Sequence, residues 1–444
     1  MHIFSVTRAR TMRRRSLAVL VAALIIGVPA CIGGALAQAD LLGAAKATPF
    51  DRPVAMAIDT HTGRAFIVSA TRTDLKPPTL GALRVIDAST MAVLRTYPMG
   101  AGTVAVDERL QRAVAVDPTT GLMRVLDTRS GDILQTVIVG HETGSTEGAV
   151  AVSDRTDRVF ILDPSPYPHA GLVRMFDALS GKLLQTIGVG IAPGKVAVDE
   201  WTSRVFVLNG ANGIRGQTGS VSVLDARTGH VVRTTVVGTL PNDVIFDPRS
   251  RRAFIVSGTR TLYVLDARTG RYLRTVTVGA MPAAVAIDPA RERAYVINMQ
   301  SSNVSMLDTR TTGVLRTIRL PEPPSALAID ERTGRVWIGS WDFNAQGAPR
   351  GVNHVYVLDG TTGAIVRRIT EEGEPAQILV DGRTRRVFVL NGDGYTWTYR
   401  TATDRWSWIP ASLRRRLPFI PTPSPATSTL RPVSGNISSF ATTL

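Results

Sequence analysis

The sequence predicts an all-β fold, an eight-bladed β-propeller whose blades are four-stranded antiparallel sheets. Three observations lead to this prediction: a recurring phrase, its regular spacing, and four strand-like runs inside each repeat. The phrase is an apolar run that ends in aspartate, followed by a polar turn and a second apolar run, as in VSVLDARTGHVVRT from Val221 and LYVLDARTGRYLRT from Leu262. Self-similarity of this kind is the mark of a repeat architecture.

The aspartates of the phrase recur every 40 to 51 residues, at Asp87, Asp127, Asp177, Asp225, Asp266, Asp308 and Asp359, with an eighth equivalent position near Arg400. Within each unit, alternation and β-branched residues indicate four short strands. The fourth unit shows them clearly, at Lys195–Asp199, Arg204–Asn209, Val221–Asp225 and Val231–Thr235. Four antiparallel strands at this period are typical of a propeller blade.

Eight runs rich in alanine and valine qualify as the first, innermost strand of a blade, because only small side chains fit where the blades converge. They are Val54–Asp59, Thr103–Asp107, Ala149–Ser153, Val196–Asp199, Asp243–Asp247, Ala284–Asp288, Ala326–Asp330 and Gln377–Asp381. Tyr395–Arg400 and Arg405–Ile409 would complete the eighth blade. The alternative is seven blades with an extra terminal sheet.

The two ends of the chain differ from the repeats in composition. Residues 1–37 predict an export signal, because an arginine-rich stretch without acids precedes the apolar run Leu17–Leu36. Downstream, the sequence divides into a linker at 38–51, the propeller at 52–410, and a tail rich in Pro, Ser and Thr at 411–444 that predicts disorder.

Three fates of the signal stay open. Ala35-Leu36-Ala37 suits cleavage by signal peptidase, Val28-Pro29-Ala30-Cys31 resembles a lipobox whose Cys31 would carry a lipid, and the apolar run could also stay as an uncleaved anchor. All three place the repeats outside the cytoplasm, secreted or periplasmic, because the arginine cluster stays inside. Contact with a membrane is expected only through this N-terminal anchor.

A short motif carries a family resemblance. Tyr295-Val296-Ile297-Asn298 follows a Val-Gly-x-x-Pro segment at Val278 to Pro282, and Phe-Val-Leu-Asn runs begin at Phe206 and Phe388. In these motifs the chain resembles the YVTN family of β-propeller repeat proteins, which includes periplasmic and surface-layer propellers, over roughly Arg52 to Ile409. The resemblance implies a propeller and leaves the activity open, because fold does not imply function.

The connections between strands predict two unequal faces. Short, uniform turns such as Asp225-Ala-Arg-Thr-Gly229 join the third and fourth strands, with Asp accepting backbone hydrogen bonds and Gly supplying positive φ. Longer insertions collect on the other face, at Ser69–Ala82, Asp163–Gly171, Asn209–Ser220 and Gly339–His354, with a lengthened connection at Gly140–Gly148. Loops on a rigid scaffold usually carry function, so binding is expected on the face that bears the insertions.

Aromatic and guanidinium groups in these loops are the candidate binding residues, because both can stack on sugars, bases or peptide side chains. Trp341 and Phe343 are the best candidates, and the full set is Trp341, Phe343, Arg350, Tyr395, Trp397, Arg72, Tyr167, His169 and Arg215. The expected partner is a protein or a cell-envelope polymer.

Signals for catalysis, metals and cofactors are weak in the sequence. The histidines that follow the signal, among them His61, His230 and His354, fall in separate units without metal-ligand spacing, and no cofactor is expected. A lactonase- or lyase-type propeller enzyme is the alternative, with candidate groups His141, Glu142, Glu147, Glu371, Glu372 and Glu374. Binding of single-stranded DNA is a third hypothesis, weakened because the signal and tail arginines account for more than half of the net charge of +15.

Overall fold

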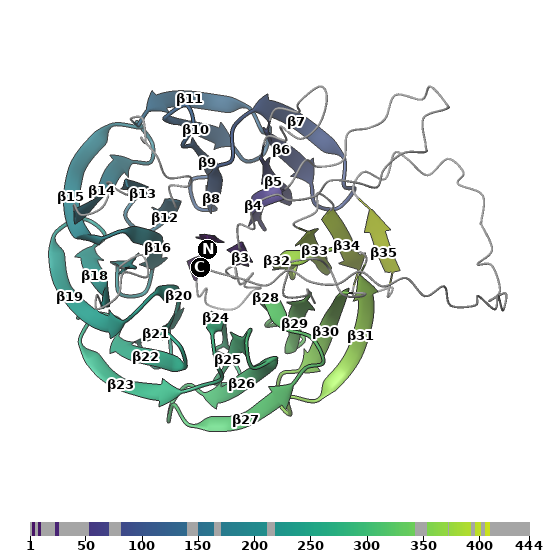
Figure 1. Cartoon of the computed structure of the whole chain (residues 1–444). Helices are drawn as coiled ribbons and strands as arrows, with labels where there is room; N and C mark the ends of the chain where they lie inside the picture. The colour runs from purple at the N-terminus through teal and green to yellow at the C-terminus, as the bar shows by residue number, and fades with distance from the viewer. Residues whose placement is uncertain are drawn as a thin grey trace, which may run out of the picture. The chain divides into compact units, whose positions relative to one another are not determined.

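A computed structural model describes residues 2–4, 8–9, 23–25, 53–70, 81–139, 150–163, 170–210, 218–341, 353–371, 373–391, 396–400 and 405–408. Eight four-stranded antiparallel sheets built from consecutive strands form a ring, with each first strand nearest the centre and each fourth strand at the rim (Figure 1). The predicted eight-bladed β-propeller is confirmed, and the alternative of seven blades is wrong. The residues described contain no helix of the length and apolarity needed to cross a membrane.

The first four blades have these strands. Blade 1 contains β4 (Pro53–Asp59), β5 (Arg64–Ser69), β6 (Ala82–Asp87) and β7 (Val93–Pro98). Blade 2 contains β8 (Thr103–Asp107), β9 (Arg112–Asp117), β10 (Leu122–Asp127) and β11 (Ile133–Ile138). Blade 3 contains β12 (Val150–Ser153), β13 (Arg158–Asp163), β14 (Ala170–Asp177) and β15 (Leu183–Ile191). Blade 4 contains β16 (Pro193–Asp199), β17 (Arg204–Asn209), β18 (Gly219–Asp225) and β19 (Val231–Gly238).

The remaining four blades repeat the same order. Blade 5 contains β20 (Pro241–Asp247), β21 (Arg252–Ser257), β22 (Thr261–Asp266) and β23 (Tyr272–Thr277). Blade 6 contains β24 (Pro282–Asp288), β25 (Arg293–Asn298), β26 (Asn303–Asp308) and β27 (Val314–Arg319). Blade 7 contains β28 (Pro324–Asp330), β29 (Arg335–Ser340), β30 (Asn353–Asp359) and β31 (Ile365–Glu371). Blade 8 contains β32 (Pro375–Asp381), β33 (Arg386–Asn391), β34 (Thr396–Arg400) and β35 (Arg405–Trp408).

The hydrophobic core lies between successive blades. Every residue of β24 is buried, because an inner strand packs on both of its faces, whereas β27 at the rim exposes most of its residues. Phe206 of blade 4 meets Phe246 of blade 5 edge-on, with ring centroids 4.9 Å apart. This gradient explains why alanine and valine dominate the inner strands.

The ring closes by side-chain packing, because no strand is exchanged between blade 8 and blade 1. Met56 and Ile67 of blade 1 share one buried cluster with Phe388 of blade 8. The guanidinium of Arg386 in β33 donates to the carbonyl of Ser89 in the last turn of blade 1. Closure therefore depends on contacts between residues far apart in the sequence.

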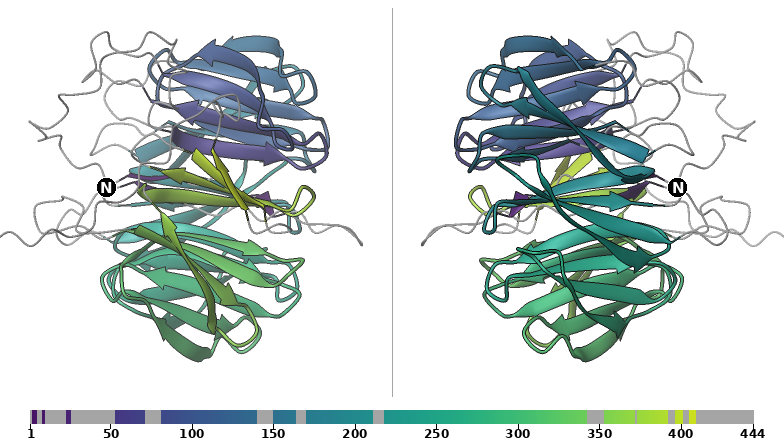
Figure 2. Two further views of the ribbon diagram at one scale, coloured as in Figure 1. Left: turned by 90° about the vertical axis from the view of Figure 1, so that its right-hand side faces the viewer. Right: turned by 90° about the vertical axis from the view of Figure 1, so that its left-hand side faces the viewer.

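Strand direction assigns each connection to one of two faces, and Figure 2 shows the strands crossing between them. The turn face carries the connections from first to second and from third to fourth strands. There Asp225 accepts hydrogen bonds from the N–H groups of Arg227 (3.1 Å) and Thr228 (3.0 Å), Gly229 has φ of 72°, and Arg204 donates to Asp225 at 2.7 Å. The recurrent Asp, Gly and Arg thus build these turns.

The insertion face carries the connections from second to third strands and from one blade to the next. All the predicted insertions belong to it, since they separate β5 from β6, β13 from β14, β17 from β18, β29 from β30, and β11 from β12. The interiors of these insertions lie outside the residues that the structure describes.

Three short strands near the N-terminus pair with inner strands. β1 (His2–Phe4) pairs with β3 (Ala23–Ile25), whose Ala23 pairs with Ala326 of β28. β2 (Arg8–Ala9) pairs in parallel with β16. These pairings do not bear on processing, so the export signal stays a prediction.

Candidate binding site on the insertion face

Blade 7 brings a predicted tryptophan against the connection from the preceding blade. Trp341 directly follows β29, and its backbone N–H donates to the carbonyl of Pro323 at 3.2 Å. Pro323 lies in the connection from β27 to β28, so both partners belong to the insertion face. This contact joins the backbone of Trp341 to the residue that follows Glu322 in that connection.

The Glu322 carboxylate contacts three side chains from the outer half of blade 7. We call Glu322, His354, Tyr356 and Arg368 the Glu322 cluster. Tyr356 donates its hydroxyl to Glu322 Oε2. Arg368 donates to Glu322 Oε1 at 3.1 Å, and His354 Nδ1 lies 3.3 Å from the same oxygen. One connection between blades is thereby tied to two strands of blade 7.

The strands position these side chains through their register. His354 and Tyr356 alternate along β30 and pair with Thr370 and Arg368 of β31. The Ser340 hydroxyl donates to the His354 carbonyl at 3.1 Å, which fixes the start of β30. The cluster therefore sits at the edge of the blade where the long insertion returns to the sheet.

Burial sets the ionisation of the cluster. It lowers the pKa of His354, and the neighbouring Arg368 guanidinium lowers it further, while Glu322 opposes the shift. Burial and the hydrogen bond to Glu322 raise the pKa of Tyr356. Near neutral pH, His354 is therefore uncharged and Tyr356 is a hydrogen-bond donor.

Arg368 is the member that faces solvent. Its side chain is 51% exposed, against 12% for Glu322 and 9% for His354. Its guanidinium carbon lies 5.9 Å from the centre of the Tyr356 ring, so the cation is held over an aromatic face as well as by a carboxylate. The arrangement presents a preoriented guanidinium to solvent.

The structure describes two of the predicted binding residues. Trp341 is hydrogen-bonded through its backbone to Pro323, the sequence neighbour of Glu322, and Trp397 is placed by its backbone in β34, paired with Val389 and Trp408. The others lie outside the described residues: Phe343, Arg350, Tyr395, Arg72, Tyr167, His169 and Arg215. Of the alternative catalytic set, His141, Glu142, Glu147 and Glu372 also lie outside it.

Sequence reasoning missed most of the Glu322 cluster. A usable signal exists, because Glu322 stands in Leu320-Pro-Glu-Pro-Pro where the equivalent connection reads Val278-Gly-Ala-Met-Pro. His354 similarly falls at the position of Thr261 and Asn303 in the neighbouring repeats. Departures from the repeat mark this site.

The inner strands consist mostly of Ala, Val and Ile, but they also contain a buried pair of opposite charges. Lys195 of β16 forms an ion pair with Asp243 of β20, and their side chains are 2% and 3% exposed. Asp243 further accepts from the N–H groups of Val244 (2.8 Å) and Val285 (2.9 Å). Burial lowers the pKa of Lys195 and raises that of Asp243, and their mutual attraction opposes both shifts. The pair joins blades 4, 5 and 6.

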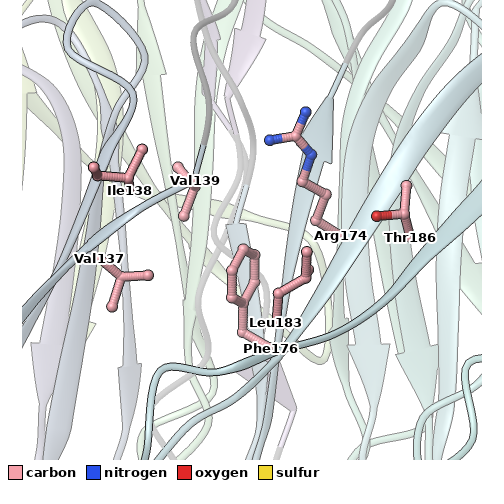
Figure 3. Close-up of a pocket in the computed structure, with 7 residues that line it drawn as sticks. All are labelled: Val137, Ile138, Val139, Arg174, Phe176, Leu183 and Thr186. Atoms are coloured by element: carbon pink, nitrogen blue, oxygen red, sulfur yellow. The ribbon is translucent and has the colours of Figure 1, made fainter.

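A groove of about 560 Å³ lies at the rim between blades 2 and 3 (Figure 3), lined by Val137, Ile138, Val139, Arg174, Phe176, Leu183 and Thr186. Its lining is mostly apolar, and its one charged group, Arg174, donates to Asp163. Small-molecule sites combine apolar walls with several convergent polar groups, which this lining does not provide.

The ring and the blade 7 site define the class of the protein, a β-propeller with its polar side-chain cluster on the face that bears the insertions. The model of the Choice-of-anchor I domain matches residues 102–384, more than half of the chain. The chain belongs to this family, and the likeness to YVTN repeats remains one of motif. No curated protein matches the sequence.

Solved structures share the fold at low sequence identity. The chain is similar to the Dos1 propeller with a TM-score of 0.62 and 11% identity, covering 79% of this chain and 93% of that one. It is similar to BamB from Moraxella catarrhalis with a TM-score of 0.53 and 16% identity, covering 81% and 98%. For the dihydro-heme d1 dehydrogenase NirN in complex with DHE the values are 0.58 and 14%, covering 82% and 73%. These likenesses concern the fold alone.

Proposed function

We propose that this protein is an exported, noncatalytic scaffold that binds a protein or a cell-envelope polymer through the insertion face of its propeller. The Glu322 cluster is the observation that supports this most directly, because it holds the half-exposed Arg368 in place against a connection of the insertion face. A guanidinium that is ordered before binding loses little entropy on contact with a partner.

Binding is favoured over catalysis by where the cluster lies. His354, Tyr356 and Arg368 belong to the third and fourth strands of blade 7, toward the rim, whereas a lactonase- or lyase-type site would need a base and an electrophile converging near the axis. The four polar groups also satisfy one another, with Arg368 left as the exposed member.

Two features support a location outside the cytoplasm. The N-terminal arginine stretch and the apolar run after it have the form of an export signal. Membership of the Choice-of-anchor I family agrees with a role at the cell surface. Among proteins of similar fold, NirN is a dehydrogenase, so fold likeness does not choose between binding and catalysis.

The test compares retention on the cell envelope of the producing organism. In one variant the chain between Ser340 and Asn353 is replaced by the short turn that follows Asn298 in blade 6, and in another Arg368→Ala removes the exposed cation. Both are expected to weaken retention, by about tenfold for the point variant if a charged hydrogen bond is lost. Arg233→Ala, an exposed rim arginine of blade 4, is the matched control.

Unchanged retention of both variants, with a native circular dichroism spectrum, would remove blade 7 from the binding surface. Retention of the wild type that falls steeply with salt and is competed by single-stranded DNA would favour the nucleic-acid hypothesis instead.

A further inference from the structure

The turn face carries a second polar cluster, between blades 1 and 2. Asp59 ends β4, His61 lies in the turn that follows, and Glu108 follows β8 of the neighbouring blade. One carboxylate oxygen of each acid and one imidazole nitrogen lie within 4.8 Å of one another. His61 Nδ1 is 3.2 Å from Glu108 Oε2, and the His61 side chain is 47% exposed, so the cluster is open to solvent.

Hydrogen bonds from the turn of blade 1 orient the carboxylates of Asp59 and Glu108. Asp59 Oδ1 accepts from the N–H groups of His61 (2.8 Å) and Thr62 (3.1 Å). Glu108 Oε1 accepts from the N–H and hydroxyl of Thr60, at 3.1 and 2.8 Å. One oxygen of each carboxylate is thus held by the turn of blade 1, while Oε2 of Glu108 faces His61 and Oδ2 of Asp59 has no hydrogen-bond partner among the residues described.

The repeats provide an internal comparison for Asp59. In three other blades the equivalent aspartate accepts, through its second oxygen, the hydroxyl of the threonine three residues later, as in the pairs Asp199–Thr202, Asp330–Thr333 and Asp381–Thr384. In blade 1, Asp59 Oδ2 and Thr62 Oγ1 are both buried and neither has a hydrogen-bond partner among the residues described. Asp247 Oδ2 and Ser250 Oγ of blade 5 share this property, but there Arg249 and Pro289 stand at the positions of His61 and Glu108. Asp59 itself is 0% exposed.

A buried carboxylate oxygen without a hydrogen-bond partner is costly, and in blade 1 it coincides with a histidine and a glutamate that can ligate a metal. From this geometry we propose that Asp59, His61 and Glu108 bind a divalent transition-metal ion, Zn²⁺ being the ion that this donor set fits best. One imidazole nitrogen and two carboxylate oxygens are the donors Zn²⁺ accepts, at about 2.0–2.2 Å. Two tetrahedral ligands at that range lie about 3.3 Å apart, close to the separation of His61 from Glu108.

A bound ion would stabilise the ring and would take no part in binding at the insertion face. Asp59 and His61 come from blade 1 and Glu108 from blade 2, so a bound ion links the blade that closes the ring to its neighbour. Because no strand is exchanged between blade 1 and blade 8 among the residues described, a metal link on the other side of blade 1 would stabilise the assembled ring by mass action. The solvent-exposed side of His61 leaves room for water to complete the coordination.

The test uses the full chain, stripped with a chelator and then titrated with Zn²⁺, with Mn²⁺ and Mg²⁺ as separate arms. Bound metal is counted by elemental analysis, and thermal unfolding is followed by circular dichroism. We expect one Zn²⁺ per chain, a higher melting temperature with Zn²⁺, and little response to Mg²⁺. His61→Gln changes a half-exposed side chain and should weaken Zn²⁺ binding at least tenfold while the apo protein melts as before; Glu108→Gln should do likewise.

His230→Gln is the matched control, because His230 is an exposed histidine in a turn of blade 4 and is not part of the carboxylate cluster. It should leave both metal content and the Zn²⁺-dependent melting shift unchanged. The proposal is overturned if the wild type retains no Zn²⁺ at micromolar concentrations, or if His61→Gln binds it as tightly as the wild type. In that case the cluster is an ordinary ion pair between two blades.

Discussion

Removal of the Lys195 ammonium is expected to destabilise the ring strongly. Lys195→Met keeps the length of the side chain and deletes its charge, leaving the Asp243 carboxylate, 3% exposed, with only the N–H groups of Val244 and Val285. Breaking a buried ion pair by removing one partner costs about 3–5 kcal/mol, because the other charge stays buried without compensation. Asp243→Asn should cost a similar amount for the same reason.

The double variant Lys195→Met/Asp243→Asn separates this cause from lost packing. It removes both charges, and the amide oxygen can still accept from Val285, so it should be no less stable than either single variant, which corresponds to a coupling energy of at least about 3 kcal/mol. Chemical denaturation of the four proteins measures the cycle, with the exposed Lys182→Met as a control expected to change stability by less than about 0.5 kcal/mol. Additive losses in the double variant would refute the account of a buried, mutually compensated pair.

Three further predictions concern stability. Burial alone would raise the pKa of Asp225 and Asp266, but hydrogen bonds from their turns outweigh it and lower both pKa values below 3.8. The stability that these carboxylates contribute above pH 3.8 should therefore be lost as the pH falls below that value. A melting temperature unchanged between about pH 6 and about pH 3 would contradict this. Arg386→Ala removes the contact to Ser89 that closes the ring and should cost about 1.5–3 kcal/mol in denaturant unfolding, whereas a neutral effect would mean that packing alone closes the ring. Tyr356→Phe deletes the hydroxyl that holds Glu322 and should cost about 1 kcal/mol while loosening Arg368, detectable as weaker envelope retention; full retention would separate Arg368 order from binding.

The fold was predictable because the same pattern of four strands recurs in every repeat. Strand alternation and the terminal aspartates located all eight inner strands, and β20 and β24 begin within two residues of the predicted Asp243 and Ala284. The number of blades was harder to decide, because the last strand, with Trp406 and Trp408, lacks the repeat pattern. The structure resolves it by pairing β35 with β34.

The blade 7 site was predictable only in part. Trp341 was singled out because an aromatic residue in a long insertion stands out in the sequence, and its role in binding stays a prediction. Glu322 and Arg368 are 46 residues apart and meet only when the connection from blade 6 folds against β31, so no local pattern joins them. His354 was set aside as an isolated histidine for the same reason.

The ion pair between inner strands could have been found by aligning the repeats. Lys195 and Asp243 occupy the same position in adjacent inner strands, since they pair with Leu208 and Val256 of their respective second strands. Equivalent positions of adjacent blades are neighbours in a ring. The opposite charges were visible in the sequence, and only the repeat register connects them.

The central claim, that the insertion face binds the partner, is tested most directly by site-specific photo-crosslinking in the producing organism. A photoreactive amino acid is placed either at Arg368 on the insertion face or at Arg227 in an exposed turn of the opposite face. If the insertion face binds the partner, position 368 gives a discrete adduct and position 227 gives none. Adducts from position 227 alone, or equally from both positions, would contradict it.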